Sequence, residues 1–524
     1  MADIDNEKVN DIEIGIVGSG SMGGGMTLLF SQNGSRVGCY DYEKEAVEKL
    51  MKEAKEDENV DENLVHGFTS LEKLVNAFPK ASKDEKDKKP RIVVLSMPHG
   101  KGVDKIEDQI LPLLEKGDIV VDGGNEWWAE TEHRQAKAKD KGIQWVGMGV
   151  SGGYQSARHG PSMSPGCTKE AWEYLKPYLE KWAAKTPEGE PCVMHIGPGG
   201  SGHYVKMIHN GIEHAHLSIL CEVRALLHYQ LGLSNDEISN LFESWWKDGP
   251  LRGNFLIGIG FKGLRFKEGG GIEHAQDGIV EKIEDKVTQD VDLSEGTGTW
   301  SAKEIAERHV AAPAIAAAHQ LRIISSDKQE RSKVADNLNL PQPSKAKEAK
   351  LEKAEKDKLL DTVHTAVYGA ILGAFIQGLD IITKASQDQK WNVELATCIK
   401  IWRQGCIIQS DAIAEFFLPL FEKFGPSEPL NILKSIPEIA KELAKTYDAQ
   451  KKLYTIAIET DAVAPALGAS LEYIKSINCR DLNTNFQELE LDYFGHHNYD
   501  LKGKAEKGHE KGKYHTEFAK MPGV

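Results

Sequence analysis

A glycine-rich turn, Gly18 to Gly23, constrains the fold more than any other feature of the chain. It joins a short β-branched segment, IEIGIVG, to an apolar helical segment, MTLLFSQNG. Up to Gly199, further β-branched segments alternate with helical patterns: SRVGCYD, PRIVVLSM, DIVVDGG and IQWVGMGVSGG. This alternation is typical of a parallel sheet with helices on both faces. We therefore predict an α/β Rossmann domain over residues 1–199.

The pattern changes beyond Gly200. Long helical periodicities run from His203 to about Tyr473, with breaks expected at Gly258–Gly271 and Leu340–Pro343. The apolar stretch Ala366–Leu379 is too short to span a bilayer and indicates a buried helix. We predict a large all-α domain over residues 200–480 and a C-terminal tail over residues 481–524.

Composition narrows the class of partner. The 524 residues carry a net charge of −16, which excludes nucleic acid and anionic membranes as expected partners and leaves small molecules. The N-terminus is acidic and polar, and the seven cysteines form no CxxC pair. These features indicate a cytoplasmic protein with reduced thiols and no export signal. We expect no metal, because the adjacent rings of His496 and His497 rarely reach one ion.

The glycine turn predicts a dinucleotide site. Glycines let the backbone turn sharply and approach a pyrophosphate, which then lies at the N-terminus of the following helix. The second predicted strand ends at Asp41, about 20 residues after Gly18, where a ribose-binding acid is expected. A carboxylate there repels a 2′-phosphate, and Lys44 is the only nearby cation, so the sequence favours NAD over NADP. The alternative is a turn without a ligand. The predicted cofactor residues of this region are Gly18, Gly20, Ser21, Met22, Gly23, Asp41 and Tyr42.

A polar stripe in the segment HYVKMIHNGIEH predicts the reactive site. Lys206, His209, Asn210 and Glu213 have the spacing i, i+3, i+4 and i+7, which places them on one face of a helix. Two loops after predicted strands, DGGN at Asp122–Asn125 and VSGG at Val150–Gly153, add polar groups where parallel sheets bind ligands. The alternative is an interface stripe of satisfied polar groups.

These motifs together resemble the long-chain 6-phosphogluconate dehydrogenases, a family of β-hydroxyacid dehydrogenases. The resemblance runs through most of the chain and also includes ARHGPSMSPG, GTGTW, IWRQGCIIQS, DYFGHH and YHTEF. It implies oxidative decarboxylation of 6-phosphogluconate to ribulose 5-phosphate, and a homodimer in which each tail reaches the partner's active site. Lys206 matches the family's general base and Glu213 its general acid. Asn125 also matches a position beside the nicotinamide, and Met97 is predicted to bind the cofactor. The resemblance implies the substrate-binding residues Asn125, Ser151, Gly152, Gly153, His209, Asn210, His214, Thr297, Arg322 and His497.

The chain departs from the family's pattern where phosphate groups are expected. Asp41, Tyr42 and Glu43 replace an Asn-Arg-Thr that grips the 2′-phosphate of NADP. Glu295 and Leu491 replace a lysine and an arginine for the substrate phosphate, and His214 replaces a tyrosine. Three interpretations follow: an NAD-preferring enzyme for 6-phosphogluconate or a related aldonate, an NADP-dependent enzyme with rearranged phosphate contacts, and a non-catalytic cofactor-binding protein. A dehydrogenase of a non-phosphorylated sugar acid stays open as well.

Overall fold

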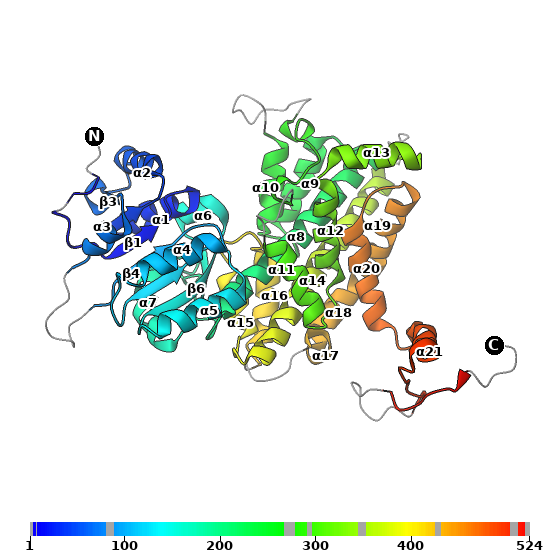
Figure 1. The fold of residues 1–524 in the computed structure, drawn as a ribbon. Helices are drawn as coiled ribbons and strands as arrows, with labels where there is room; N and C mark the ends of the chain where they lie inside the picture. The colour runs from blue at the N-terminus through cyan, green and yellow to red at the C-terminus, as the bar shows by residue number, and fades with distance from the viewer. Residues whose placement is uncertain are drawn as a thin grey trace. The chain divides into compact units, whose positions relative to one another are not determined.

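The computed structural model describes residues 4–6, 8–79, 89–266, 278–290, 296–343, 353–424, 431–503 and 512–518. It divides into two compact units, Met1–Leu471 and Glu472–Val524. The first unit contains the Rossmann-like sheet with its helices and the large helical part that follows (Figure 1). The predicted fold class is therefore confirmed, while the predicted boundaries at residues 199 and 480 stay a prediction.

A seven-stranded sheet forms the first part of the chain, in the order β3-β2-β1-β4-β5-β6-β7. All neighbouring strands are parallel except β6 and β7, which are antiparallel. The five strands that the sequence predicts are present. The other two were not predicted, because β3 (VHGF) contains a histidine and a glycine, and β7 contains Pro165, which an edge strand tolerates. The strands are β1 (Ile14–Val17), β2 (Val37–Tyr40), β3 (Val65–Phe68), β4 (Ile92–Leu95), β5 (Ile119–Asp122), β6 (Gln144–Ser151) and β7 (Ser162–Gly166).

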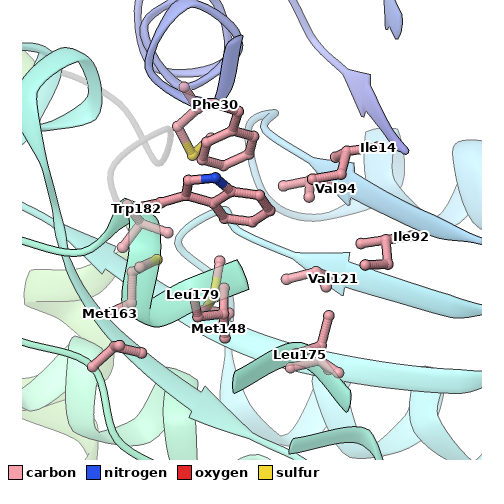
Figure 2. Close-up of a cluster of buried hydrophobic side chains, with 14 of the residues drawn as sticks. Ile14, Phe30, Ile92, Val94, Val121, Met148, Met163, Leu175, Leu179 and Trp182 are labelled. Carbon is pink, nitrogen blue, oxygen red and sulfur yellow. The ribbon is translucent and has the colours of Figure 1, made fainter. Parts of the chain in front are cut away.

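Apolar side chains cover both faces of this sheet. In β4, Ile92 and Val94 belong to one buried cluster, whereas Val93 and Leu95 belong to another. Figure 2 shows the first cluster, in which Phe30 stacks on Trp182 with ring centroids 3.7 Å apart. A parallel sheet buried on both faces has nearly continuous apolar strands, as here. The accompanying helices are α1 (Ser21–Gln32), α2 (Lys44–Glu56), α3 (Leu71–Asn76), α4 (Lys101–Ile110), α5 (Trp128–Lys139), α6 (Gly153–His159) and α7 (Lys169–Trp182).

The helical part is built around two long helices, α8 (Ser201–Ala225) and α14 (Lys353–Gln389), which pack on each other. By length and composition Ala354–Gln389 could cross a membrane, but 89% of its apolar window is buried inside the fold. The predicted buried helix at Ala366–Leu379 is thus confirmed. The remaining helices of the first unit are α9 (Asn235–Lys247), α10 (Phe255–Leu264), α11 (Thr297–Glu307), α12 (Pro313–Ser325), α13 (Lys328–Leu338), α15 (Leu395–Ile401), α16 (Asp411–Phe421), α17 (Ile432–Ser435), α18 (Pro437–Lys445) and α19 (Tyr447–Glu459), with α20 (Pro465–Asn478) running into the second unit.

The predicted break at Gly258–Gly271 is wrong in its first half. Helix α10 continues through Gly258, Gly260 and Gly263, because its apolar side chains pack on α9. A Cβ on Gly258 would lie 2.9 Å from the Trp246 indole nitrogen, so the glycine permits this close approach. Residues 267–277, which hold the second half of the predicted break, lie outside the described residues.

The second unit holds helix α21 (Thr484–Gly495) and a short pairing of Tyr499 with Tyr514. The buried carboxylate of Asp492 joins its two segments, because it accepts N–H groups from Asn498 and Thr516 and contacts His515 Nδ1 at 3.0 Å. The described residues beyond Leu501 form no helix longer than one turn.

Candidate active site

The four stripe residues lie on α8 as the spacing predicts, and three of them are buried. Lys206 is 8% exposed, His209 0% and Asn210 7%, while the Glu213 side chain is 20% exposed. The Lys206 ammonium donates to Asn210 Oδ1 at 2.7 Å, one turn further along the helix. It also donates to Ser151 Oγ at 3.3 Å, at the end of β6. The structure therefore brings the predicted base together with residues from both parts of the first unit.

His209 closes a ring of hydrogen bonds around this lysine. Its Nδ1 lies 3.0 Å from Asn210 Oδ1, an acceptor, so Nδ1 carries the proton. Its Nε2 then accepts from the Ser151 hydroxyl at 3.0 Å. Burial, and secondly the Lys206 charge, hold the pKa of His209 well below its usual value. The imidazole is therefore neutral, and its 3.8 Å approach to Glu213 Oε2 is not an ion pair.

Glycines allow α8 to pack this closely against the sheet. A Cβ on Gly149 of β6 would lie 2.3 Å from Lys206 Cβ, and a Cβ on Gly202 of α8 would lie 2.3 Å from the carbonyl oxygen of Gly147 in β6. Any side chain at these positions would force the helix away from β6. The contact between Lys206 and Ser151 depends on this spacing.

The two predicted loops lie at the carboxyl ends of β5 and β6. Asn125 is exposed. It follows Gly124, where a Cβ would lie 2.8 Å from the Met97 carbonyl oxygen, so the two loops approach each other closely here. Gly152 has φ +104°, and a Cβ there would lie 2.1 Å from Ser156 Oγ. A Cβ on Gly153, with φ +67°, would meet open space. Asn125, Gly152 and Gly153 thus border the carboxyl edge of the sheet as expected.

The glycine turn has the shape that a pyrophosphate requires. Gly18 has φ +103°, and a Cβ there would lie 2.1 Å from the Ser96 carbonyl oxygen; a Cβ on Gly23 would lie 1.9 Å from the Gly18 carbonyl oxygen. A Cβ on Gly20, by contrast, would meet nothing within 4 Å, and Gly20 caps α1 without a side-chain hydrogen bond. The first N–H groups of the helix, from Ser21, Met22 and Gly23, follow this open position. These residues fit a dinucleotide.

Asp41 has a second role that the sequence did not reveal. Its Oδ2 accepts the Ser19 N–H at 2.6 Å and its Oδ1 accepts the Glu43 N–H at 3.0 Å. The carboxylate therefore holds the glycine turn against the end of β2. Tyr42 beside it is 83% exposed. These hydrogen bonds explain an aspartate at this position even if no ribose binds to it. Asp41 by itself therefore does not indicate NAD.

His214 lies on α8 beside residues of α11 and α12. It is 5% exposed, its Nδ1 has no hydrogen-bond partner among the described residues, and burial lowers its pKa to about 3, with Arg322 and His319 adding to the shift. A Cβ on Gly298, next to Thr297, would lie 3.0 Å from His214 Cε1 and 2.7 Å from His319 Nδ1. Sequence reasoning missed His319, although it lies three residues before Arg322 and therefore on the same helix face.

Three residues of the predicted phosphate end are not tested by the structure. Glu295 lies outside the described residues. Leu491 is half-buried and His497 exposed, both in the second unit. No group of three or more His, Cys, Asp or Glu side chains in the described ranges is placed to hold a metal ion.

Comparison with known proteins agrees with this geometry. Residues 13–197 match the NAD binding domain of 6-phosphogluconate dehydrogenase, and residues 202–518 match the C-terminal domain of the same enzyme. A 6-phosphogluconate dehydrogenase, decarboxylating, from Emericella nidulans is 42% identical over 489 residues, which cover 92% of this chain and 96% of that protein. A rice enzyme of this name, decarboxylating 1, is 33% identical, covering 97% of this chain and 98% of its own.

A solved structure is similar along the whole chain. Plasmodium falciparum 6-phosphogluconate dehydrogenase, determined in its apo form, with its cofactor NADP+ and with its substrate 6-phosphogluconate, superposes with a TM-score of 0.82. The two are 32% identical, and the match covers 97% of this chain and 100% of the other. With both domain models matched in order and a 42% identical relative, this chain belongs to the 6-phosphogluconate dehydrogenase family.

Proposed function

We propose that this protein oxidises and decarboxylates 6-phosphogluconate to ribulose 5-phosphate and carbon dioxide, with reduction of a nicotinamide dinucleotide. The observation that carries the proposal is the buried Lys206, held between Asn210 on its own helix and Ser151 on the sheet. The Emericella and Plasmodium relatives, which carry the enzyme's name, support it.

Lys206 is the proposed general base. The bound cofactor supplies the hydride acceptor. To act as the base, the Lys206 ammonium first gives up a proton, and the neutral amine then takes the proton of the substrate hydroxyl as the hydride leaves the same carbon. Once protonated, Lys206 donates a hydrogen bond to the new ketone oxygen, which stabilises the negative charge that develops there as carbon dioxide leaves. Because the imidazole of His209 is neutral, the protonated Lys206 is the cation among these hydrogen-bonded groups.

Glu213 is the proposed general acid. Loss of carbon dioxide leaves an enediol, which needs a proton on carbon to give the ketopentose. Glu213 lies one turn beyond His209 on the same face of α8, and its partial exposure lets it exchange protons with water. We assign the substrate carboxylate and hydroxyls to a set of backbone and side-chain donors and acceptors on α8 and the two loops: Asn125, Ser151, Gly152, Gly153, His209 and Asn210.

We assign the far end of the substrate to His214, Thr297 and Arg322, with His497 of the tail. Arg322 supplies a cation beside His214 and His319, which favours an anionic group at this end. The second candidate is a non-phosphorylated aldonate, favoured by Glu295 and Leu491 at positions where the family's phosphate-binding cations stand. We favour the phosphorylated substrate, because Arg322 and His497 are retained.

For the cofactor we propose NADP+, against the NAD preference that the sequence predicts. The support is the similarity to the Plasmodium enzyme, whose cofactor is NADP+. The carboxylate of Asp41, on which the NAD prediction depends, is engaged by Ser19 and Glu43. Lys44 would have to leave Glu48, 3.1 Å away, to reach a 2′-phosphate. A higher kcat/KM with NAD than with NADP would contradict this choice and favour the NAD prediction instead.

We also propose that the protein is a cytoplasmic homodimer. Exposed apolar side chains support an interface between copies: Phe486 and Phe494 on α21 are 64% and 72% exposed, and Ile324 and Leu338 on α12 and α13 are 58% and 60% exposed. The seven free cysteines agree with a reducing compartment. Sedimentation equilibrium tests the dimer, which should have twice the 57.9 kDa mass of one chain.

The decisive experiment compares 6-phosphogluconate with gluconate by following cofactor reduction. Rapid turnover of 6-phosphogluconate, slow turnover of gluconate, and a raised KM for 6-phosphogluconate in Arg322→Ala would support the proposal. If gluconate is used as well and Arg322→Ala leaves both rates unchanged, the second candidate replaces it. No reduction with either acid would favour the non-catalytic alternative.

A further inference from the structure

A buried carboxylate joins the two loops that carry Met97 and Asn125. Glu126 follows β5 directly after Asn125 and is 3% exposed. Its Oε2 accepts the N–H of Gly100, in the loop that follows β4, at 3.1 Å. Its Oε1 accepts the N–H of Trp127 in its own loop at 2.8 Å. One side chain therefore binds both loops at once.

Arg134 of α5 holds this carboxylate in place. The guanidinium, 2% exposed, donates to Glu126 Oε2 at 2.6 Å and to Asp104 of α4 at 2.7 Å. Asp122, at the end of β5, lies 3.8 Å from the same guanidinium. The guanidinium thus faces three carboxylates, those of Glu126, Asp104 and Asp122. Arg134 and Glu126 are both buried, so each charge depends on the other, whereas the Asp104 side chain is 50% exposed.

The two loops also contact each other through their backbones. Gly123 donates its N–H to the Leu95 carbonyl at 2.9 Å, and a Cβ on Gly124 would lie 2.8 Å from the Met97 carbonyl oxygen. The pairing of β4 and β5 therefore continues into the start of the two loops. Asn125 is exposed, so the direction of its side chain depends on the backbone that Glu126 holds.

We propose that Glu126 is a positioning residue that sets Met97 and Asn125 relative to each other, and so orients the nicotinamide toward the substrate. The proposal rests on the proposed function, which assigns Asn125 to the substrate, and on the prediction that Met97 binds the cofactor. The glycine turn packs on Ser96, directly before Met97, but Ser96 is held by the strand pairing, because it donates its N–H to the Val17 carbonyl at 2.8 Å. Asp41 holds the other side of the turn, so neither contact depends on Glu126.

Glu107 provides a matched control. It is also a glutamate with 3% exposure, and it also links α4 to α5, through Lys137 at 2.8 Å. Because this link joins the two helices and neither loop, removal of Glu107 should cost stability without moving Met97 or Asn125.

The experiment compares Glu126→Ala, Glu126→Gln and Glu107→Ala in thermal unfolding, in cofactor binding by fluorescence titration, and in steady-state kinetics with 6-phosphogluconate. All three variants should unfold at lower temperature than the wild type. Glu126→Ala should lose roughly 10- to 100-fold in kcat, the cost of a misplacement of about 1 Å. Its cofactor dissociation constant should change less than about threefold, because the strand pairing and Asp41, rather than Glu126, hold the glycine turn. Glu126→Gln, which keeps the shape and one acceptor, should lie between the wild type and alanine.

A purely structural role predicts a different pattern. If Glu126→Ala and Glu107→Ala share one melting temperature and both keep wild-type kcat, the proposal is wrong. If Glu126→Ala does not fold, wild-type kcat in Glu126→Gln overturns it instead. Asn125→Ala tests the role of Asn125 separately from the role of Glu126. Unchanged activity in that variant would reject the role of Asn125 in the proposed function, whatever Glu126 does.

Discussion

The Lys206 ammonium nitrogen lies 2.7 Å from Asn210 Oδ1 and shares that acceptor with His209 Nδ1. Both donors come from one face of α8, and the Ser151 hydroxyl closes the ring from β6. The arrangement fixes the direction of the Lys206 side chain before any substrate binds. A base that is held in this way loses little entropy when it reacts.

Lys206→Met should abolish turnover and leave cofactor binding intact, because it removes the base and spares the glycine turn. The loss in kcat should be at least about a hundredfold. Steady-state kinetics and a fluorescence titration with reduced cofactor measure the two effects. A Lys206→Met enzyme that keeps most of its rate would refute the assignment of the base.

Glu213→Gln should slow protonation of the enediol more than hydride transfer. The amide keeps the shape of the side chain but has no acidic proton to give. Exchange of solvent deuterium into the new carbon–hydrogen position of ribulose 5-phosphate reports this step separately from cofactor reduction. Equal slowing of both steps would show that Glu213 acts on binding or folding instead.

Asp41→Asn with Tyr42→Arg should move the ratio of kcat/KM toward NADP, whatever the wild-type preference. The change removes a negative charge and adds a cation where a 2′-phosphate would lie. The amide oxygen introduced by Asp41→Asn can still accept the backbone N–H of Ser19 or Glu43, so the turn should survive. Asp41→Asn alone serves as the control. An unchanged ratio of kcat/KM in the double variant would show that the 2′-phosphate of NADP binds elsewhere.

Glu222 should make stability depend on pH between its unfolded and folded pKa values. Burial raises its pKa from 4.5 to about 7, although its oxygens accept the N–H groups of Ala466 and Leu467 at the start of α20. Because the folded pKa is the higher one, the folded state binds more protons in this window, and stability falls as pH rises from 4.5 to 7. Glu222→Gln removes this dependence. In chemical denaturation, the free energy of unfolding of the variant should rise relative to that of the wild type by at most about 3 kcal/mol between pH 4.5 and pH 7. A constant difference across the window would contradict the raised pKa.

The local parts of this protein follow from its sequence. The spacing of Lys206, His209, Asn210 and Glu213 puts them on one face of any helix, because the helical repeat is fixed by the backbone. The glycine turn between a strand and a helix has the same local character. The five predicted strands and the buried helix Ala366–Leu379 also follow from patterns within a few residues.

Contacts between distant segments were decided only by the tertiary structure. The place of Ser151 between Lys206 and His209 requires α8 to pack on β6, which the glycines at 149 and 202 allow. The second role of Asp41, the approach of His319 to His214, and the link from Glu126 to Gly100 each join residues that are far apart in sequence or on different elements. No periodicity encodes such pairs, because they depend on how whole elements pack and which buried polar groups must then find partners.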